Sequence, residues 1–194
     1  MRPCRLRSLL LGALLAVALP SALPAELAGV TLAPTVSLDG RTLILNGAGI
    51  RTRFLFKVYV AGLYLSQPSD EAVRVLDSRE PRRIELRMLR ELDADTLFAA
   101  LESGLRANLT AAELAGFAPR IAELDEIFRR VGKAASGDRI TLDVDARGVT
   151  ISVNEQRQGR LDDAAFARAL LSIWLGAHPV DSALKRALLG GKGE

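Results

Sequence analysis

Cysteine and histidine are nearly absent from this 194-residue chain, in which each occurs once, as Cys4 and His178. Cys4 lies in an N-terminal segment that we expect to be removed, so the mature chain would contain no thiol. Disulfide bonds, cysteine-ligated metals and a Cys-His nucleophile are then excluded. His178 stands in Gly-Ala-His-Pro after a predicted helix, which is typical of a cap or turn. Because a metal site would depend almost wholly on carboxylates, we expect neither a metal nor a cofactor.

Long hydrophobic runs are also scarce, and the only one is close to the N-terminus. Arg2, Arg5 and Arg7 precede the apolar run 9–19, and the small residue Ala25 follows it at a suitable distance for cleavage. This order predicts a secretory signal peptide over residues 1–25. The run is shorter than the about 20 residues that a membrane-spanning helix needs. We therefore expect a periplasmic or otherwise exported protein with no transmembrane segment after cleavage, and an uncleaved N-terminal anchor is the alternative.

The mature chain would have no excess of either charge. The whole chain has 26 basic and 23 acidic residues, and the N-terminal segment holds three arginines and no acid, which leaves 23 of each. The high isoelectric point therefore belongs largely to the export signal, and the usual inference from basicity to nucleic acid loses its support. We therefore expect no nucleic-acid partner. Residues 26–194 are long enough to bury one hydrophobic core without disulfide bonds or structural metals, so we expect a single domain.

The order of hydrophobic patterns predicts an α+β fold. Alternation with period 2 indicates strands, and apolar residues three or four apart behind a capping residue indicate helices. We expect strands over 36–38, 43–45, 51–65, 83–89, 138–144, 149–153 and 158–161, and helices over 69–77, 93–109, 110–131, 162–175 and 180–188. Strands and helices in separate blocks, rather than alternating βαβ units, are typical of the α+β class. In the penultimate helix, Phe166, Leu170 and Trp174 are expected to pack on the sheet.

The most informative segment is 47–65, which places two arginines and two tyrosines inside a strand-forming run. Its glycine-rich start permits a corner or bulge before one long strand. Strict alternation puts Arg51 and Tyr59 on one face. A bulge near Gly49 or Arg53 would instead bring Arg51 into phase with Tyr64, so both tyrosines stay under consideration. A structural alternative is that the arginines form exterior ion pairs and Tyr59 only packs.

Gly-x-Gly-x-Arg followed by Lys-Val-Tyr-Val-x-Gly-Leu-Tyr-Leu resembles the chalcone isomerase family, in particular its bacterial, exported, chalcone isomerase-like branch. The C-terminal runs 166–180 and 184–190 are similar to the closing helices of that family. The resemblance covers nearly all of the chain after its first thirty or so residues. It implies a curved, mostly antiparallel sheet with helices packed on one face and a ligand cleft between the two layers.

The resemblance also implies a function. Family members without isomerase activity bind fatty acids through an arginine and a tyrosine that engage the ligand carboxylate, and Arg51 and Tyr59 match those positions. This sequence departs from the plant isomerases, because Tyr59 stands where they have threonine and because 97–108 lacks the tyrosine, lysine and asparagine signature of their middle helix. We therefore expect a non-catalytic protein that binds a small amphiphilic carboxylate such as a fatty acid through Arg51, Tyr59 and Tyr64.

Two alternatives to this interpretation stay open. The first is an isomerase or intramolecular lyase of the chalcone isomerase type, in which Arg51 would be the catalytic electrostatic stabiliser. The second is a ligand-free interaction protein whose protein partners the sequence does not identify.

Overall fold

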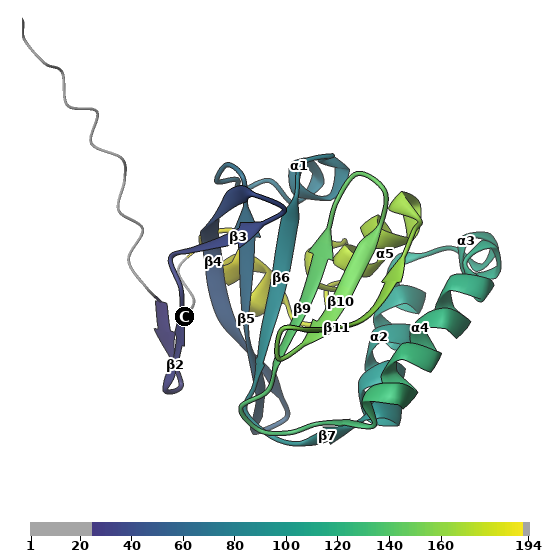
Figure 1. Ribbon diagram of the computed structural model, residues 1–194, viewed down its shortest axis with the longest axis horizontal. Helices are drawn as coiled ribbons and strands as arrows, with labels where there is room; N and C mark the ends of the chain where they lie inside the picture. Colours follow the sequence, from purple (N-terminus) through teal and green to yellow (C-terminus); the bar gives the residue numbers. More distant parts are fainter. Residues whose placement is uncertain (1–24, 192–194) are drawn as a thin grey trace, which may run out of the picture.

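The protein is built on a seven-stranded antiparallel sheet with the strand order β11-β10-β9-β6-β5-β4-β3 (Figure 1). The computed structural model describes residues 25–191, so the predicted signal segment lies outside the described residues except for Ala25. The strands of the sheet are β3 (Thr35–Leu38), β4 (Arg41–Arg53), β5 (Phe56–Leu65), β6 (Arg82–Met88), β9 (Arg139–Val144), β10 (Val149–Val153) and β11 (Gln156–Leu161). Two short pairs join β1 (Ala25–Leu27) to β2 (Val30–Leu32) and β7 (Leu92–Asp93) to β8 (Lys133–Ala134).

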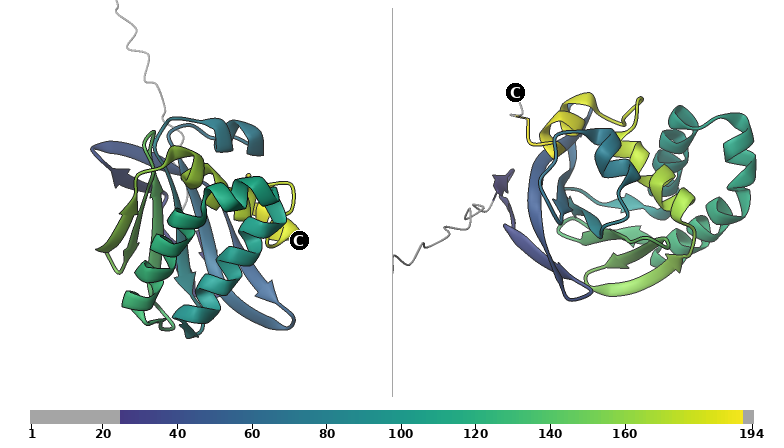
Figure 2. Two further views of the ribbon diagram at one scale, coloured as in Figure 1. Left: turned by 90° about the vertical axis from the view of Figure 1, so that its right-hand side faces the viewer. Right: turned by 90° about the horizontal axis from the view of Figure 1, so that it is seen from above.

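The helices lie on the concave face of this curved sheet (Figure 2). They are α1 (Ala72–Asp77), α2 (Ala94–Asn108), α3 (Ala111–Gly116), α4 (Ala118–Val131), α5 (Ala164–Leu175) and α6 (Ser182–Leu188). Helix α5 packs against α2, and α6 lies along β4. The arrangement confirms the predicted α+β class, with a curved antiparallel sheet and helices packed on one face. Within residues 25–191, no helix combines the length and hydropathy that a membrane crossing requires.

The main core lies between the sheet and α5. Phe166, Leu170 and Trp174 are all almost fully buried, as the sequence pattern predicts. Alternate residues of β5, from Tyr59 through Ala61, Leu63 and Leu65, face them from the sheet. Hydrophobic burial of this α5 face is the main local source of stability.

The predicted long strand over 51–65 is wrong, because the chain turns back at Phe54-Leu55. Arg53 and Phe56 are register partners at the end of the β4–β5 hairpin, so the loop has two residues. No glycine, asparagine or proline marks this turn, which is why the pattern suggested a continuous strand. As a result, Phe54 and Phe56 are exposed at the hairpin tip and do not belong to the core.

The predicted irregularity near the glycine-rich start is present as a register shift between Leu45 and Gly47. Neither Gly47 nor Gly49 has a positive φ, so turn geometry does not explain these glycines. Their role is close approach, since a Cβ at Gly47 would lie 2.1 Å from the Ala187 carbonyl oxygen of α6. Glycine therefore lets the last helix lie directly on β4.

Helix starts follow the predicted caps in the middle of the chain. Asp93 accepts a hydrogen bond from the Thr96 amide at 2.7 Å, and Thr110 and Glu113 form a capping box. Helix α1 instead begins at Ala72, with Glu71 at its N-cap position. Ser69 lies before the helix, where its amide donates to the Asn46 side-chain oxygen at 2.7 Å and its hydroxyl oxygen accepts from the Glu71 amide at 3.3 Å.

The charged face of β6 is largely buried, although alternation of charged and apolar residues is typical of a strand with one solvated face. Arg83 is held by two hydrogen bonds to Asp143 of β9, one of them 2.8 Å long, and Glu85 is buried beside Arg87. The neighbouring strand β9 supplies Asp143, a partner that alternation within one strand does not reveal.

Candidate functional site

The β4–β5 hairpin brings Arg51 and Tyr59 together. The two residues are direct register partners across the hairpin, one on β4 and the other on β5. Side chains of directly opposed residues lie on the same face of an antiparallel pair. Tyr59 belongs to the core beneath α5, so both residues lie on the face that carries the helices. The predicted pairing of Arg51 with Tyr59 on one face is therefore what the structure shows.

Tyr59 is bound at its hydroxyl group by the indole of α5. Trp174 Nε1 donates a hydrogen bond of 3.0 Å to the Tyr59 oxygen, and Tyr59 is only 9% exposed. Burial raises the pKa of Tyr59 to about 12, and the Trp174 hydrogen bond and the Arg51 charge oppose that shift. The phenol is consequently neutral at physiological pH and keeps its proton.

Arg51 lies between the hairpin and the start of α6. Its Nη1 donates to the carbonyl oxygen of Thr52 and lies 3.4 Å from Asp181 Oδ2. Asp181 is the N-cap of α6, and its other oxygen accepts hydrogen bonds from the Ala183 and Leu184 amides at 2.9 and 3.0 Å. The Arg51–Asp181 contact is longer than a strong charge-assisted hydrogen bond of about 2.7–2.9 Å. Asp181 thus serves mainly as the helix cap and only secondarily as an ion-pair partner.

Tyr64 is separated from this pair by the sheet itself. It lies five residues from Tyr59, and its hydroxyl group donates to the Ala33 carbonyl oxygen at 3.0 Å beside the N-terminal hairpin. Burial raises its pKa, and the nearby Glu85 acts in the same direction. The structure therefore brings Arg51 and Tyr59 together and places Tyr64 on the opposite face.

Three donor groups of the Arg51–Tyr59 pair have no acceptor within residues 25–191. Among residues 25–191, no acceptor is found for the Tyr59 proton, whose oxygen accepts from Trp174. In the same part of the chain, the Arg51 hydrogen bonds all come from Nη1, which leaves Nε and Nη2 without a partner. An arginine edge with two parallel N–H groups and a neighbouring phenol is a suitable set of donors for one carboxylate.

Helix α6 and the segment before it cover this site. Asn46 Nδ2 of β4 donates to the Leu188 carbonyl oxygen at 2.8 Å, and Lys185 Nζ donates to the Gly176 carbonyl oxygen at 2.7 Å. The Arg51 side chain is 18% exposed beneath α6. The site is therefore accessible at Arg51 and enclosed at Tyr59.

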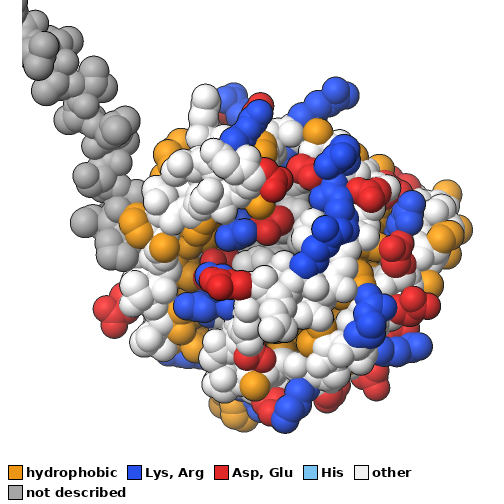
Figure 3. All heavy atoms as spheres, in the orientation of Figure 1, with side chains coloured by type: hydrophobic (Ala, Val, Ile, Leu, Met, Phe, Trp, Pro, Cys, Tyr) orange, Lys and Arg blue, Asp and Glu red, His pale blue; other side chains and the backbone are white. Residues whose placement is uncertain are grey.

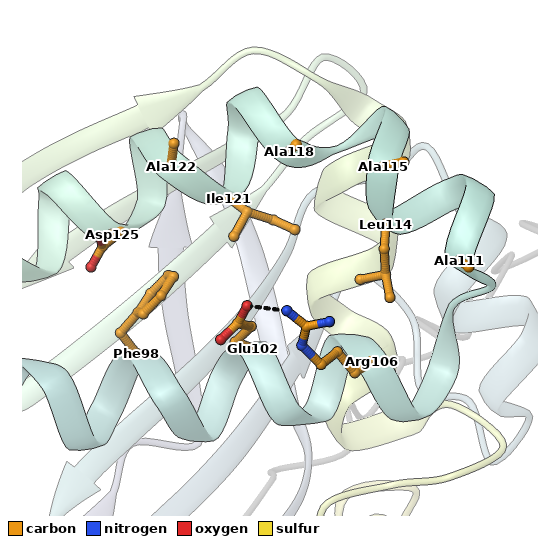
Figure 4. Close-up of a pocket in the computed structure, with 10 residues that line it drawn as sticks. All are labelled: Phe98, Glu102, Arg106, Ala111, Leu114, Ala115, Ala118, Ile121, Ala122 and Asp125. Atoms are coloured by element: carbon orange, nitrogen blue, oxygen red, sulfur yellow. Dashed lines mark hydrogen bonds and ion pairs between the residues drawn. The ribbon is translucent and has the colours of Figure 1, made fainter.

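A different hollow lies between α2 and the α3–α4 pair and has a volume of about 530 Å³. Figure 4 shows Phe98, Leu114 and Ile121 pointing into it, with small alanines along its α3 and α4 sides. Its arginine, Arg106, donates to Glu102 one helical turn away at 2.6 Å. This groove is apolar and its cation is already paired, so it lacks the free donors of the Arg51 site.

Two further hollows are lined by charged side chains that form ion pairs within the protein. One of about 660 Å³ lies beside α1 and contains Asp77, which forms an ion pair with Arg168. Arg82 also lines it; the Nε atom of this buried arginine has no partner in the described range, and burial lowers its pKa to about 10. The other, of about 290 Å³, contains the Arg160–Asp145 pair. Neither hollow includes Arg51 or Tyr59.

The part of the chain that the structure describes contains no cluster of side chains that suggests a metal site. Residues 25–191 contain no group of three or more histidine, cysteine or carboxylate side chains placed to hold a metal ion. His178 is exposed, and its backbone is fixed by Asn108, which accepts from its amide at 3.0 Å and donates to its carbonyl oxygen at 2.8 Å. The turn role predicted for His178 agrees with these contacts.

Two residues of the site were not assigned to it from the sequence. Asp181 precedes a helical run and follows Pro179, which is a recognisable N-cap signal, but its proximity to Arg51 depends on tertiary structure. Trp174 was expected only to pack. An indole N–H in a core requires an acceptor, and the few polar groups predicted on strands could have suggested Tyr59 as that acceptor.

Comparisons with known proteins agree with this architecture. No curated protein matches the sequence significantly. Among solved structures, a fatty-acid binding protein of Arabidopsis thaliana is similar with a TM-score of 0.68 and 14% sequence identity, over 86% of this chain and 95% of that chain. At this identity, the likeness establishes a shared fold. The model of a family described as chalcone isomerase-like matches residues 24–190, and the chain therefore belongs to the chalcone isomerase-like family.

Proposed function

We propose that this protein binds a small amphiphilic carboxylate, such as a fatty acid, and does not change it chemically. In this proposal, the Arg51 guanidinium holds the carboxylate through Nε and Nη2, and the Tyr59 hydroxyl donates a further hydrogen bond. The observation that carries the proposal is the Arg51–Tyr59 pair with its unused donors in residues 25–191. The plant fatty-acid binding protein with the same fold is a precedent for this class of ligand.

The orientation of Tyr59 favours binding over acid–base chemistry. With a pKa raised to about 12 by burial, Tyr59 gives up its proton too reluctantly to act as a general base near neutral pH. Trp174 donates to the hydroxyl oxygen, so the hydroxyl proton stays available for an acceptor on a ligand. A neutral donor beside a permanent cation is suited to holding an anion.

The ligand tail belongs with the apolar side chains under α6. Leu184 and Leu188 of α6 are buried in the core that also contains Tyr59. Entry of a tail therefore requires α6 to move away from β4. Helix α6 has seven residues, and its polar attachments to the rest of the fold include the hydrogen bonds of Asn46 and Lys185 and the Arg51–Asp181 contact.

The test is titration calorimetry of the delipidated protein with a soluble fatty acid. Loss of a hydrogen bond to a charged group costs roughly 1.5–3 kcal/mol, so Arg51→Ala is expected to weaken binding by about one to two decades. Arg51→Lys should also bind poorly, because lysine cannot form two parallel hydrogen bonds. Arg83→Ala is the matched control, since Arg83 pairs with Asp143 on the opposite face.

Two results would contradict the proposal. One is a delipidated parent protein that binds no fatty acid, and the other is an Arg51→Ala variant that binds as tightly as the parent while Arg83→Ala does the same. Cyclisation of a chalcone, followed by absorbance, separates binding from isomerase activity. Turnover that disappears in Arg51→Ala would replace the binding proposal with the enzymatic alternative.

The proposed location of this protein is the periplasm or another exported compartment. The support is the charge and length pattern of residues 1–25 in the sequence. We expect the exported form to begin near Glu26, as determined by the intact mass of protein recovered from the host. A chain that retains Met1 in the host cytoplasm would contradict this location without affecting the binding test.

A further inference from the structure

The tip of the β4–β5 hairpin exposes three large hydrophobic side chains in succession. Phe54, Leu55 and Phe56 are 87, 94 and 61% exposed. Among residues 25–191, the only other strongly exposed large hydrophobic residue is Val73, on α1. Single exposed apolar residues are ordinary, but a contiguous group on a projecting turn marks an interaction site. In Figure 3, hydrophobic side chains gather at the lower edge of the molecule, where the hairpin ends in Figure 1.

The backbone of this tip is also unusual for its sequence. Phe54 has a φ of 54°, in the left-handed region that a bulky residue rarely adopts. Glycine is favoured at the first position of such a two-residue hairpin loop. An aromatic residue is held there in a strained conformation with its ring in solvent, so neither packing nor turn geometry accounts for it.

Basic side chains surround the apolar tip. Arg53 lies over the Phe54 ring with its guanidinium carbon 5.8 Å from the centroid, and Arg90 lies over Phe56 at 4.9 Å. Lys57 is exposed on the returning strand. Within residues 25–191, none of Arg53, Lys57 and Arg90 forms an ion pair.

The acidic residues near the tip do not neutralise these cations. Glu91 is bound by Lys133 at 2.9 Å, and Asp93 caps α2 by accepting from the Thr96 amide. Asp181, closer to the sheet, contacts Arg51 and caps α6. The tip therefore combines an apolar apex with three positive charges that form no ion pair within the described residues.

We propose that this hairpin tip docks the protein on an anionic lipid surface. Phe54, Leu55 and Phe56 enter the boundary between headgroups and acyl chains, and Arg53, Lys57 and Arg90 lie against the lipid phosphates. A stable protein partner needs a surface of about 800 Å² on each side, whereas this apex consists of three side chains on a narrow turn. Apolar insertion assisted by basic residues is the usual way in which small elements bind anionic membranes.

The proposal stands on observations other than those at the carboxylate site, although the two are neighbours. Arg51 lies two residues before Arg53 on β4. A protein docked through the tip would hold the Arg51–Tyr59 pair close to the lipid surface. If the proposed function is correct, this position supplies the amphiphilic ligand directly from the membrane.

The experiment is cosedimentation of the protein, as recovered from its host, with vesicles of phosphatidylcholine alone or mixed with phosphatidylglycerol. We expect binding to the mixed vesicles and little binding to phosphatidylcholine. Leu55→Ser should lower the partition coefficient by about tenfold or more, because it removes the leucine that would be buried in the lipid. Arg53→Ser and Arg90→Ser should each lower it by about fivefold.

The controls lie at the opposite end of the sheet, where β5 pairs with the start of β6. Val73→Ser removes another exposed apolar residue, and Arg79→Ser removes an exposed cation. Neither should change vesicle binding. Mass spectrometry must show that all forms have the same N-terminus, so that the apolar run near Met1 contributes equally to every measurement.

A fluorescent reporter separates insertion from surface attraction. The single tryptophan, Trp174, is only 2% exposed and gives a constant background. Leu55→Trp should show a blue shift with mixed vesicles, and Val73→Trp should not. The proposal is overturned if the parent does not bind mixed vesicles, if Leu55→Ser binds as the parent does, or if the Leu55→Trp emission does not move. A tip-dependent dimer without vesicle binding would identify a second copy as the occupant.

Discussion

Tyr59 and Tyr64 lie five residues apart on one strand, and both are buried, yet they serve opposite faces of the sheet. Successive side chains of a strand alternate, so an odd separation places two residues on different sides. Tyr59 faces α5 and is the register partner of Arg51. Tyr64 pairs with Arg83 and reaches Ala33 beside the N-terminal hairpin. Similar burial of the same residue type therefore does not imply a similar role.

The hydrogen bonds of the two hydroxyl groups differ in direction. Tyr64 donates its proton to the Ala33 backbone, which ties the sheet to the segment before β3. Tyr59 accepts from Trp174 and keeps its donor for another group. A buried tyrosine whose proton is donated to another group of the protein stabilises the fold. One whose proton has no acceptor in the described residues is a candidate for recognition.

The largest expected effect on the Tyr59 side comes from removing its indole partner. Truncation of a buried large aromatic residue costs about 3–5 kcal/mol, so Trp174→Ala should lower the free energy of unfolding by that amount. It also removes the hydrogen bond that orients the Tyr59 oxygen. Urea denaturation followed by circular dichroism measures the change. Val73→Ala, at an exposed position, is the control, and a Trp174→Ala midpoint equal to that of Val73→Ala would disprove the packing described here.

Alkaline pH should destabilise the protein through Tyr59. Because burial raises the Tyr59 pKa from 10.0 to about 12, the folded state favours the protonated phenol. Its stabilisation is fully present below pH 10 and is lost as the pH rises through about 12. A shift of this size corresponds to about 3 kcal/mol.

The comparison of the parent with Tyr59→Phe isolates this contribution, because the raised pKa of Tyr64 acts in the same direction in both proteins. Urea denaturation at a series of pH values should show a steeper alkaline loss for the parent. Equal slopes for the two proteins would show that Tyr59 does not titrate with a raised pKa.

A smaller loss of stability is expected on the opposite face. Tyr64→Phe removes the part-buried hydrogen bond to the Ala33 carbonyl oxygen, and such a bond contributes about 0.5–1.5 kcal/mol to stability. Thermal unfolding should detect the loss, and ligand affinity should be unchanged. A Tyr64→Phe protein with the melting temperature of the parent would mean that water replaces the hydroxyl at Ala33.

The sequence was sufficient for much of the fold because local rules held at particular residues. Asp39-Gly40, a common two-residue hairpin turn, has positive φ at both residues between the strands expected over 36–38 and 43–45, and Thr110 and Glu113 form a capping box at the start of the helix expected over 110–131. Alternation correctly placed Arg51 and Tyr59 on one face even though the expected continuous strand is a hairpin. The two-residue loop alone would pair residues of odd separation, as it does for Arg53 and Phe56, and the register shift between Arg51 and Thr52 restores the even separation of Arg51 and Tyr59.

The remaining features depend on tertiary contacts that a linear pattern does not contain. The turn at Phe54-Leu55 has no turn residues, and its strained φ contradicts local preference. Asp181 reaches Arg51 only because α6 lies on the glycines of β4. Which of Tyr59 and Tyr64 accompanies Arg51 was undecided until the position of the β4–β5 register shifts was known.

The most direct test of the account is the affinity of the delipidated protein for a soluble fatty acid, measured by calorimetry for Tyr59→Phe and Tyr64→Phe in parallel. Tyr59→Phe removes one hydrogen bond to the ligand, which contributes about 1 kcal/mol, so the dissociation constant should rise roughly fivefold. Tyr64→Phe should leave it at the parent value. Circular dichroism must show that both variants are folded. Equal affinities for Tyr59→Phe and the parent, or an equal loss in both variants, would contradict the assignment of carboxylate recognition to the Arg51–Tyr59 face.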